Sequence, residues 1–157
     1  MSRQTIERFY AAFERLDGRE MQACYAANAS FEDEVFKLEG AREIGAMWRL
    51  LCEAVQAKPE ARAHWKLTTT DITDRSAHWE ASYIFSATGR PVVNRIDAEF
   101  TFDKRGLILT HRDRFDFWNW SRQALGATGW LLGWTPMLRK KVRAQAKANL
   151  RRFLEKR

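Results

Sequence analysis

Residues 97–118 read DAEFTFDKRGLILTHRDRFDFW, and this stretch decides the fold. Two runs that alternate with period 2 flank the turn at residues 103–106, which predicts an antiparallel hairpin. On the returning strand the alternation places six side chains on one face: Leu107, Leu109, His111, Asp113, Phe115 and Phe117. A histidine and a carboxylate are therefore expected among four large apolar residues.

Burial makes His111 and Asp113 the first candidates for function. An unpaired carboxylate in an apolar environment is costly or becomes protonated, so this placement requires a polar partner or a pocket that a ligand enters. Side chains at positions i and i+2 of a strand are neighbours, so the carboxylate can orient the imidazole. Two interpretations stay open, namely acid/base catalysis on a small apolar substrate and a satisfied polar pair that fills the core.

Three more strands are predicted upstream, at about residues 63–73, 76–87 and 92–103, with a fourth at 107–117. Short turns rich in Asp, Gly and Pro separate them, so the four strands should form an antiparallel meander. Alternation gives the second and third strands one apolar face each, with the members Ala77, Trp79, Ala81, Tyr83 and Phe85, and Ile96, Ala98, Phe100 and Phe102.

Helical periodicity precedes the strands. Apolar residues recur every three or four positions over residues 2–16, 19–27 and 41–57, and Asp17-Gly18 and Lys58-Pro59 end the first and third of these segments. Between the second and third lies SFEDEVFKLEG, two short extended pieces in which Asp33 shares a face with Phe31 and Val35. Helices followed by a meander predict an α+β fold with helices packed on one face of a curved sheet.

The chain turns helical again after Trp118. Thr135 is placed to cap a last helix over residues 136–155, with Pro136 in its first turn. One stripe of this helix is apolar and comprises Leu138, Val142, Ala146, Leu150, Phe153 and Leu154. From residue 139 onward nine Lys or Arg face Glu155 alone, so the net charge of +7 belongs to this segment.

This basic helix has three interpretations. Its apolar stripe can close the sheet or pair with a second subunit while the charges are solvated. Together with the preceding WLLGW (residues 130–134), it can instead lie on an anionic membrane surface. Nucleic-acid binding is disfavoured because the helix lacks interleaved aromatic residues and the rest of the chain is not basic.

Length and composition bound the remaining possibilities. A chain of 157 residues has the size of one domain, and no apolar run approaches a membrane span of about 20 residues. The first ten residues lack the apolar stretch of a signal peptide, so we expect a soluble cytoplasmic protein. Cys24 and Cys52 are interpreted as small buried residues, and no spacing of metal ligands or phosphate-binding loop points to a metal or cofactor.

Three segments resemble the nuclear-transport-factor-two-like superfamily, which includes the SnoaL-like polyketide cyclases, ketosteroid isomerase and limonene epoxide hydrolase. They are FYAAFERLDG (9–18), YAANASFEDEVFKLEGAREIGAMW (25–48) and GLILTHRDRFD (106–116). The resemblance implies a cone-shaped domain over residues 1–118. We expect residues 119–157 to be its helical extension, and the chain to form a homodimer through the outer sheet face. It also implies a deep apolar pocket, for which the sequence offers the lining residues Tyr10, Tyr25, Trp48, Trp79, Phe100 and Phe115.

The three families place different demands on the site. Asp33 falls where ketosteroid isomerase carries its general base, but the positions of that family's oxyanion donors hold Ala12 or Phe13 and Ala98, so steroid isomerisation is disfavoured. HRDRFD places Asp113 on the catalytic aspartate of limonene epoxide hydrolase.

The hydrolase also uses an Arg-x-Asp pair on an earlier strand. This alignment puts Trp79 and Ala81 there, and a slip of one residue would bring in His78 and Glu80. The His-x-Asp pattern of the SnoaL-like cyclases, whose aspartate is an acid/base, fits this chain with the fewest departures.

Two functional hypotheses follow. In the first, the chain is a cofactor-independent cyclase, isomerase or epoxide hydrolase in which Asp113 is the principal acid/base, His111 its partner and Asp33 a second carboxylate. In the second, it is a non-catalytic protein that binds a small apolar or lipid-like ligand, in one version at a membrane surface. Polar groups that face each other across the interior favour the first, and a closed or wholly apolar interior favours the second.

Overall fold

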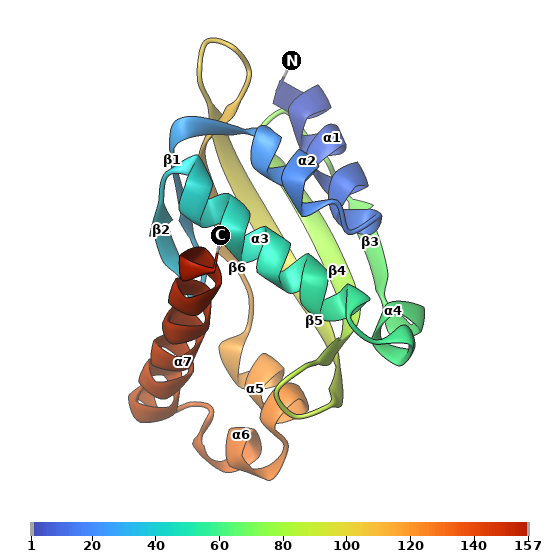
Figure 1. Cartoon of the computed structure of the whole chain (residues 1–157), viewed down its shortest axis with the longest axis vertical. Coiled ribbons are helices and arrows are strands. Elements are labelled where there is room, and N and C mark those ends of the chain that lie inside the picture. Colours follow the sequence, from blue (N-terminus) through green and yellow to red (C-terminus); the bar gives the residue numbers. More distant parts are fainter. Residues whose placement is uncertain (1, 157) are drawn as a thin grey trace.

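A computed structural model describes residues 2–156 (Figure 1). The helices are α1 (Ser2–Glu14), α2 (Gly18–Ala23), α3 (Ala41–Gln56), α4 (Pro59–His64), α5 (Phe117–Leu125), α6 (Ala127–Leu132) and α7 (Pro136–Glu155). The strands are β1 (Tyr25–Glu32), β2 (Lys37–Glu39), β3 (Lys66–Thr70), β4 (Ser76–Phe85), β5 (Arg90–Phe102) and β6 (Ile108–Arg114).

One six-stranded sheet has the order β2-β1-β6-β5-β4-β3. Strands β3 to β6 pair with their chain neighbours in antiparallel fashion, which confirms the predicted meander. Strand β1 was not predicted to join them, but it pairs parallel with β6 and sets Phe31 beside His111. This pairing makes β6 a central strand, so its inner side chains lie deep in the molecule.

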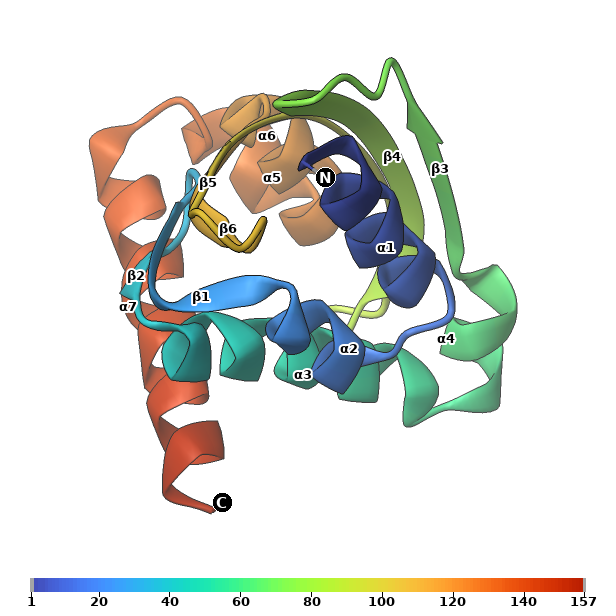
Figure 2. The same ribbon diagram turned by 90° about the horizontal axis from the view of Figure 1, so that it is seen from above.

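The sheet is strongly curved, and its concave face is covered by helices (Figures 1 and 2). Helix α1 lies inside the curve, and α2 and α3 close the opening beside it. The apolar stripe of α1, which includes Ile6, Phe9 and Phe13, is completely buried against the inner faces of the strands. The expected α+β architecture, with helices on one face of a curved sheet, is thereby confirmed.

Several element boundaries differ from the expectation. Helix α2 ends at Ala23 rather than near Ala27, because Tyr25 and the residues after it enter the sheet beside β6. The Cys24 carbonyl accepts a hydrogen bond from the Ile108 N–H at 2.8 Å, so sheet pairing overrides the helix propensity of the alanines here. Pro59 begins the short helix α4, and β3 is shorter than predicted.

The predicted face of β6 holds at His111 and Asp113 but is wrong before them. Phe102 pairs with Ile108 and Thr101 with Thr110, so Leu109 is an extra residue, a β-bulge. The bulge turns Ile108 into the core and leaves Leu109 partly exposed. After the strand, the Asp116 carboxylate accepts from the Asn119 N–H and starts α5 at Phe117.

The C-terminal helices are fixed to the cone by polar contacts. The Gln123 side chain of α5 bonds to both the N–H and the carbonyl of Val93 on β5. Thr135 caps α7 as predicted, and Leu138 and Leu150 are buried on its apolar stripe. The far end of α7 packs on α3, where the Arg49 guanidinium lies 5.6 Å from the Phe153 ring centre. None of the helices within residues 2–156 is long and apolar enough to cross a membrane.

Gly129 allows α6 to lie against α5, and a substitution there should destabilise the protein. A Cβ atom at this position would stand 1.9 Å from the Ser121 carbonyl oxygen. We expect Gly129→Ala to lower the free energy of unfolding by about 1 to 3 kcal/mol, as overpacking typically does. Urea unfolding followed by circular dichroism measures this, and Thr128→Ala on the exposed side of the same helix is the control. Equal stability of both variants would contradict the close packing.

Candidate functional site

His111 and Asp113 lie on the inner face of β6 and are sealed from solvent, with side chains 0% and 2% exposed. Pairing with β5 places His111 opposite Phe100 and Asp113 opposite Ala98. His111 Nε2 and Asp113 Oδ1 are 2.8 Å apart. The predicted pair is therefore formed, at the centre of the core.

A hydrogen-bonded chain runs through this pair. Trp48 Nε1 on α3 donates to the Tyr25 hydroxyl at 3.0 Å, and that hydroxyl lies 2.7 Å from His111 Nδ1. Because the Tyr25 oxygen already accepts from Trp48, its own proton is best donated to Nδ1. The imidazole proton then sits on Nε2 and is donated to Asp113. Both ring nitrogens are thus engaged, and the chain ends at the carboxylate.

Aromatic rings enclose the imidazole. The ring centres of Phe100, Phe31 and Phe9 lie 4.3, 5.0 and 5.6 Å from that of His111. Phe9 and Phe31 were missing from the sequence-based set of lining residues, although each belongs to an apolar pattern. Five residues of the predicted set are buried in this aromatic core, namely Tyr10, Tyr25, Trp48, Trp79 and Phe100. The sixth, Phe115, is partly exposed.

Two donors near Asp113 have no acceptor. Within the described part of the chain, the Tyr10 hydroxyl and Trp79 Nε1 are buried without a hydrogen-bond partner. Burial raises the pKa of Tyr10 well above its ordinary value, and the negative charge of Asp113 raises it further, so the two groups interact electrostatically. The Tyr10 and Trp79 ring centres are 6.1 Å apart. Because the Tyr10 ring also contacts Phe9 and Phe100, both unsatisfied donors belong to the aromatic core around His111.

Asp33 approaches the same region from the turn between β1 and β2. The expectation of a strand position is wrong, because Asp33 Oδ1 closes the turn by accepting from the Val35 and Phe36 N–H groups at 2.7 and 2.6 Å. Burial raises the pKa of Asp33 to about 7, which these two bonds oppose and the charge of Asp113 reinforces. The carboxyl groups of Asp33 and Asp113 therefore interact electrostatically.

The interior contains two apolar clusters, and Tyr83 contacts both of them. The larger cluster surrounds His111, and a smaller one is centred on Phe117 and Trp120 of α5. Tyr83 packs against both, and its hydroxyl accepts from Trp120 Nε1 at 2.8 Å. Burial raises the pKa of Tyr83 to about 12, with a contribution from Asp33. We refer to Asp33, Tyr83 and Asp113 as the seam, and note that Tyr83 and Asp33 reach partial solvent exposure.

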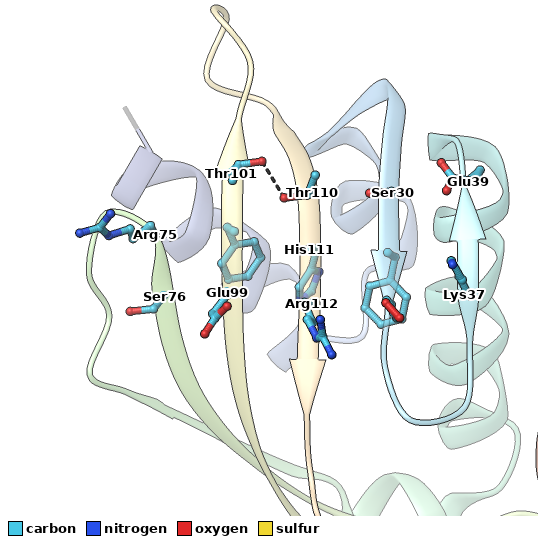
Figure 3. A pocket seen from close by; sticks show the side chains of 13 residues that line it. Ser30, Lys37, Glu39, Arg75, Ser76, Glu99, Thr101, Thr110, His111 and Arg112 are labelled. Atoms are coloured by element: carbon cyan, nitrogen blue, oxygen red, sulfur yellow. Dashed lines mark hydrogen bonds between the residues drawn. The ribbon is translucent and has the colours of Figure 1, made fainter. Parts of the chain in front are cut away.

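The outer face of the sheet carries a separate hollow of about 630 Å³ (Figure 3). Its side chains are mostly polar and come from five strands and the turn before β4, among them Ser30, Lys37, Arg75, Glu99, Thr101, Thr110 and Arg112. The His111 side chain points away from this hollow, to the inner side of the sheet. The hollow is therefore distinct from the seam.

The outer face of the sheet holds His78 and Glu80, the residues that the alternative alignment with limonene epoxide hydrolase would use. His78 Nε2 lies 2.9 Å from Glu80 Oε2, and its Nδ1 lies 2.8 Å from Asp97 Oδ1. These residues occupy the alternate positions of β4 and β5, whereas Trp79 and Ala81 face inward. A slip of one residue would thus bring no acid or base into the interior.

Neither a metal site nor a reactive cysteine is indicated in the described part of the chain. Among residues 2–156, no three His, Cys, Asp or Glu side chains are placed to hold a metal ion. Cys24 and Cys52 are buried, as predicted, and neither forms a disulfide. Burial raises their pKa values to about 11 and 12. A thiolate nucleophile is disfavoured at such pKa values.

The raised pKa of Asp33 predicts a pH-dependent stability. Between about pH 4 and pH 7 the folded protein holds a proton on Asp33 that the unfolded chain, in which this carboxyl has its ordinary pKa of 3.8, has already released. The Asp33 contribution therefore makes the fold less stable as the pH rises through this window. Asp33→Asn keeps the Oδ1 acceptor but cannot ionise, so its stability relative to wild type should increase from pH 5 to pH 8 in urea unfolding.

Asp103 supplies the matched control for this prediction. Its carboxylate closes the β5–β6 turn by accepting from the Arg105 and Leu107 N–H groups, at the far end of β6 from Asp113. Asp103→Asn is therefore measured in parallel, as a turn-closing carboxylate outside the seam. A constant difference between Asp33→Asn and wild type at all pH values would contradict the assignment.

Comparison with known proteins agrees with the fold described above. A sequence profile described as the SnoaL-like domain matches residues 6–111. A polyketide cyclase candidate from Xanthomonas campestris pv. campestris superposes with a TM-score of 0.56 at 16% identity, over 79% of this chain and 99% of that one.

A second polyketide cyclase candidate, from Silicibacter sp. TM1040, gives a TM-score of 0.57 at 19% identity, over 78% of this chain and 93% of that one. A search among curated proteins found no match. At these identities the two structures show a shared fold. The profile spans more than half of the sequence, including the helices and strands of the cone, and the chain therefore belongs to the SnoaL-like domain family.

Proposed function

We propose that the protein is a cofactor-independent acid/base enzyme whose substrate is a small apolar molecule with an oxygen acceptor, such as a carbonyl or epoxide. The observation that carries this proposal is a buried carboxylate, oriented by a histidine, in a core that also holds two buried donors without acceptors. Buried polar groups are normally satisfied, and exceptions often mark functional sites. A substrate oxygen would satisfy both donors and stand near the base.

The proposed chemistry on a carbonyl substrate is a proton transfer. Asp113 removes a proton from the carbon next to the carbonyl, the C–H electron pair moves into the new carbon–carbon double bond, and the carbonyl π pair moves onto oxygen. The Tyr10 hydroxyl and Trp79 Nε1 donate to that oxygen as its negative charge develops. Return of the proton elsewhere gives isomerisation, and attack of the enolate carbon on a second carbonyl gives cyclisation.

Asp33 and His111 have supporting roles in this proposal. With a pKa of about 7, Asp33 is partly protonated at neutral pH and can return a proton as a general acid. His111 has both nitrogens engaged, so it acts as a positioning residue that holds the Asp113 carboxylate. Trp48 and Tyr25 fix the imidazole in turn.

Access to the site requires movement, because His111 and Asp113 are sealed. The seam is the natural route, since Tyr83 and Phe115 pack against both apolar clusters and are only partly buried. Side chains between two separately packed clusters can move apart with less loss of packing than those within one. A ligand would therefore reach Asp113 past Asp33 and Tyr83.

The sealed pair also favours a second candidate function, non-catalytic binding of a small apolar ligand. His111 is completely hydrogen-bonded, which is how a structural polar pair would look. In that case Tyr10 and Trp79 would still bind a ligand oxygen, but Asp113 would exchange no proton with it. The two candidates differ in turnover and agree in binding.

Asp113→Asn tests the catalytic proposal. The amide keeps the shape of the carboxylate but removes the base, so turnover of an apolar β-diketone or epoxide from a substrate panel should fall by about 10²- to 10⁴-fold. Tyr10→Phe should lower kcat by about 10²-fold through loss of one donor. The control is Asp97→Asn on the outer face of the same sheet.

Each outcome of this experiment is informative. Unchanged turnover in Asp113→Asn would overturn the catalytic role. Binding without turnover in the wild type, seen as a ligand-induced rise in melting temperature that Tyr10→Phe abolishes, would support the binding protein instead.

We also propose that the chain forms a homodimer through the outer face of the sheet. The hollow on this face is centred on β5 and β6, where Thr101 and Thr110 share a hydrogen bond and leave a low surface between longer charged side chains. Thr110→Arg should fill that surface and convert a dimer into a monomer in light scattering coupled to size exclusion. A wild-type monomer, or a dimer that Thr110→Arg leaves intact, would contradict this interface.

A further inference from the structure

We infer that the end of the molecule formed by α6 and the start of α7 docks on the surface of an anionic lipid bilayer. The proposed contact comprises Trp130, Leu131, Leu132, Trp134, Met137, Lys140 and Lys141, here called the docking surface. It lies at the end of the molecule opposite the β5–β6 turn (Figure 1).

Large apolar side chains are unusually exposed on the docking surface. Trp134 and Met137 are 73% and 80% exposed, and Trp130 and Leu131 are 59% and 69% exposed. Single exposed apolar residues are common, but here five within eight positions of the chain gather at one end of the molecule. Such patches mark interaction sites.

The patch is held rigidly by its surroundings. Trp134 Nε1 donates to the Leu131 carbonyl, and Trp118 Nε1 donates to the Trp130 carbonyl. The Trp118 and Trp130 rings meet edge to face at 5.6 Å between centres, and Gly129 sits against the backbone of α5. The exposed rings are thus presented by an ordered turn.

The charge beside the patch has one sign. From Phe117 to Leu154 the sequence contains eight Lys or Arg and no Asp or Glu. Lys140 and Lys141 are exposed and follow Met137 by one helical turn, on the side of α7 away from its buried stripe. Arg139 and Arg143 are held by Glu34, at 3.2 Å to its carboxylate and 2.8 Å to its carbonyl, which fixes α7 on the cone.

Apolar and cationic groups on one surface match the chemistry of an anionic bilayer. Tryptophan prefers the boundary between lipid headgroups and acyl chains, leucine and methionine partition below it, and lysine pairs with anionic headgroups. A polyanion without an apolar layer would leave Leu131 and Trp134 exposed, and a neutral protein partner would leave the lysines uncompensated. The bilayer is the occupant that satisfies both.

Flotation of the full chain with lipid vesicles tests this inference. The protein should float with phosphatidylcholine vesicles that contain about one third phosphatidylglycerol, and not with phosphatidylcholine alone. Binding should weaken at least about tenfold between about 0.05 M and 0.5 M salt, because the charge contribution is screened. Trp134→Ser and the pair Lys140→Glu, Lys141→Glu should each weaken binding by about tenfold.

Matched controls separate location from composition. The pair Lys104→Glu, Arg105→Glu changes the net charge of +7 by the same amount, in the exposed turn at the opposite end of the molecule, and should leave binding close to wild type. Val93→Ser removes an exposed apolar side chain from β5 and should also have little effect.

Three results would overturn the proposal. They are no flotation of the wild type with anionic vesicles at low salt, an equal loss in the Lys104 and Arg105 pair, and self-association that Trp134→Ser abolishes in a protein that does not float. The last result would assign the surface to contact between copies of the chain. None of these measurements depends on Asp113, so they stand apart from the test of catalysis.

Discussion

Burial of the Asp113 carboxylate is the constraint on which the arrangement of the cone depends. A charged group removed from water is costly unless its surroundings replace the lost hydrogen bonds. Here His111, Tyr25 and Trp48 form a chain that spans from β6 through β1 to α3 and ends on the carboxylate. The chain fixes the position of α3 relative to the sheet more specifically than apolar packing does, since each donor has one acceptor at one distance.

The same interior leaves Tyr10 and Trp79 unsatisfied, and the contrast is instructive. Each buried donor without an acceptor costs about 1 to 3 kcal/mol of stability. Both ring nitrogens of His111 are hydrogen-bonded, whereas the donors of Tyr10 and Trp79 in the same core are not. These two unpaired donors lower the stability of the fold. An oxygen atom of a ligand that accepts from both would recover that free energy as binding energy, which is why the unsatisfied donors carry more functional weight than the satisfied pair.

Periodicity predicted the meander, the helices on its concave face and the inner positions of His111 and Asp113, because alternation is a local property of the chain. It missed the parallel pairing of β1 with β6, which joins segments about 80 residues apart and leaves no local pattern. It also placed Leu109 in the core, because strict alternation does not allow for the extra residue of a β-bulge, and no glycine marks the bulge in the sequence. Periodicity also could not predict that Phe9 contacts the imidazole, or that the donors of Tyr10 and Trp79 lack acceptors. Both depend on packing between elements, which the pattern of one strand or helix does not encode.

The turn at residues 33–36 connects the candidate site with α7. Asp33 belongs to the seam, and its carboxyl closes the turn through two backbone hydrogen bonds. Glu34, the next residue, is held from outside by Arg139 and Arg143 of α7. Contact of the proposed docking surface with a bilayer would therefore act, through α7, on the turn that borders the proposed route to Asp113. An apolar ligand dissolved in that bilayer would then meet the seam at the point where the helix that touches the lipid is anchored.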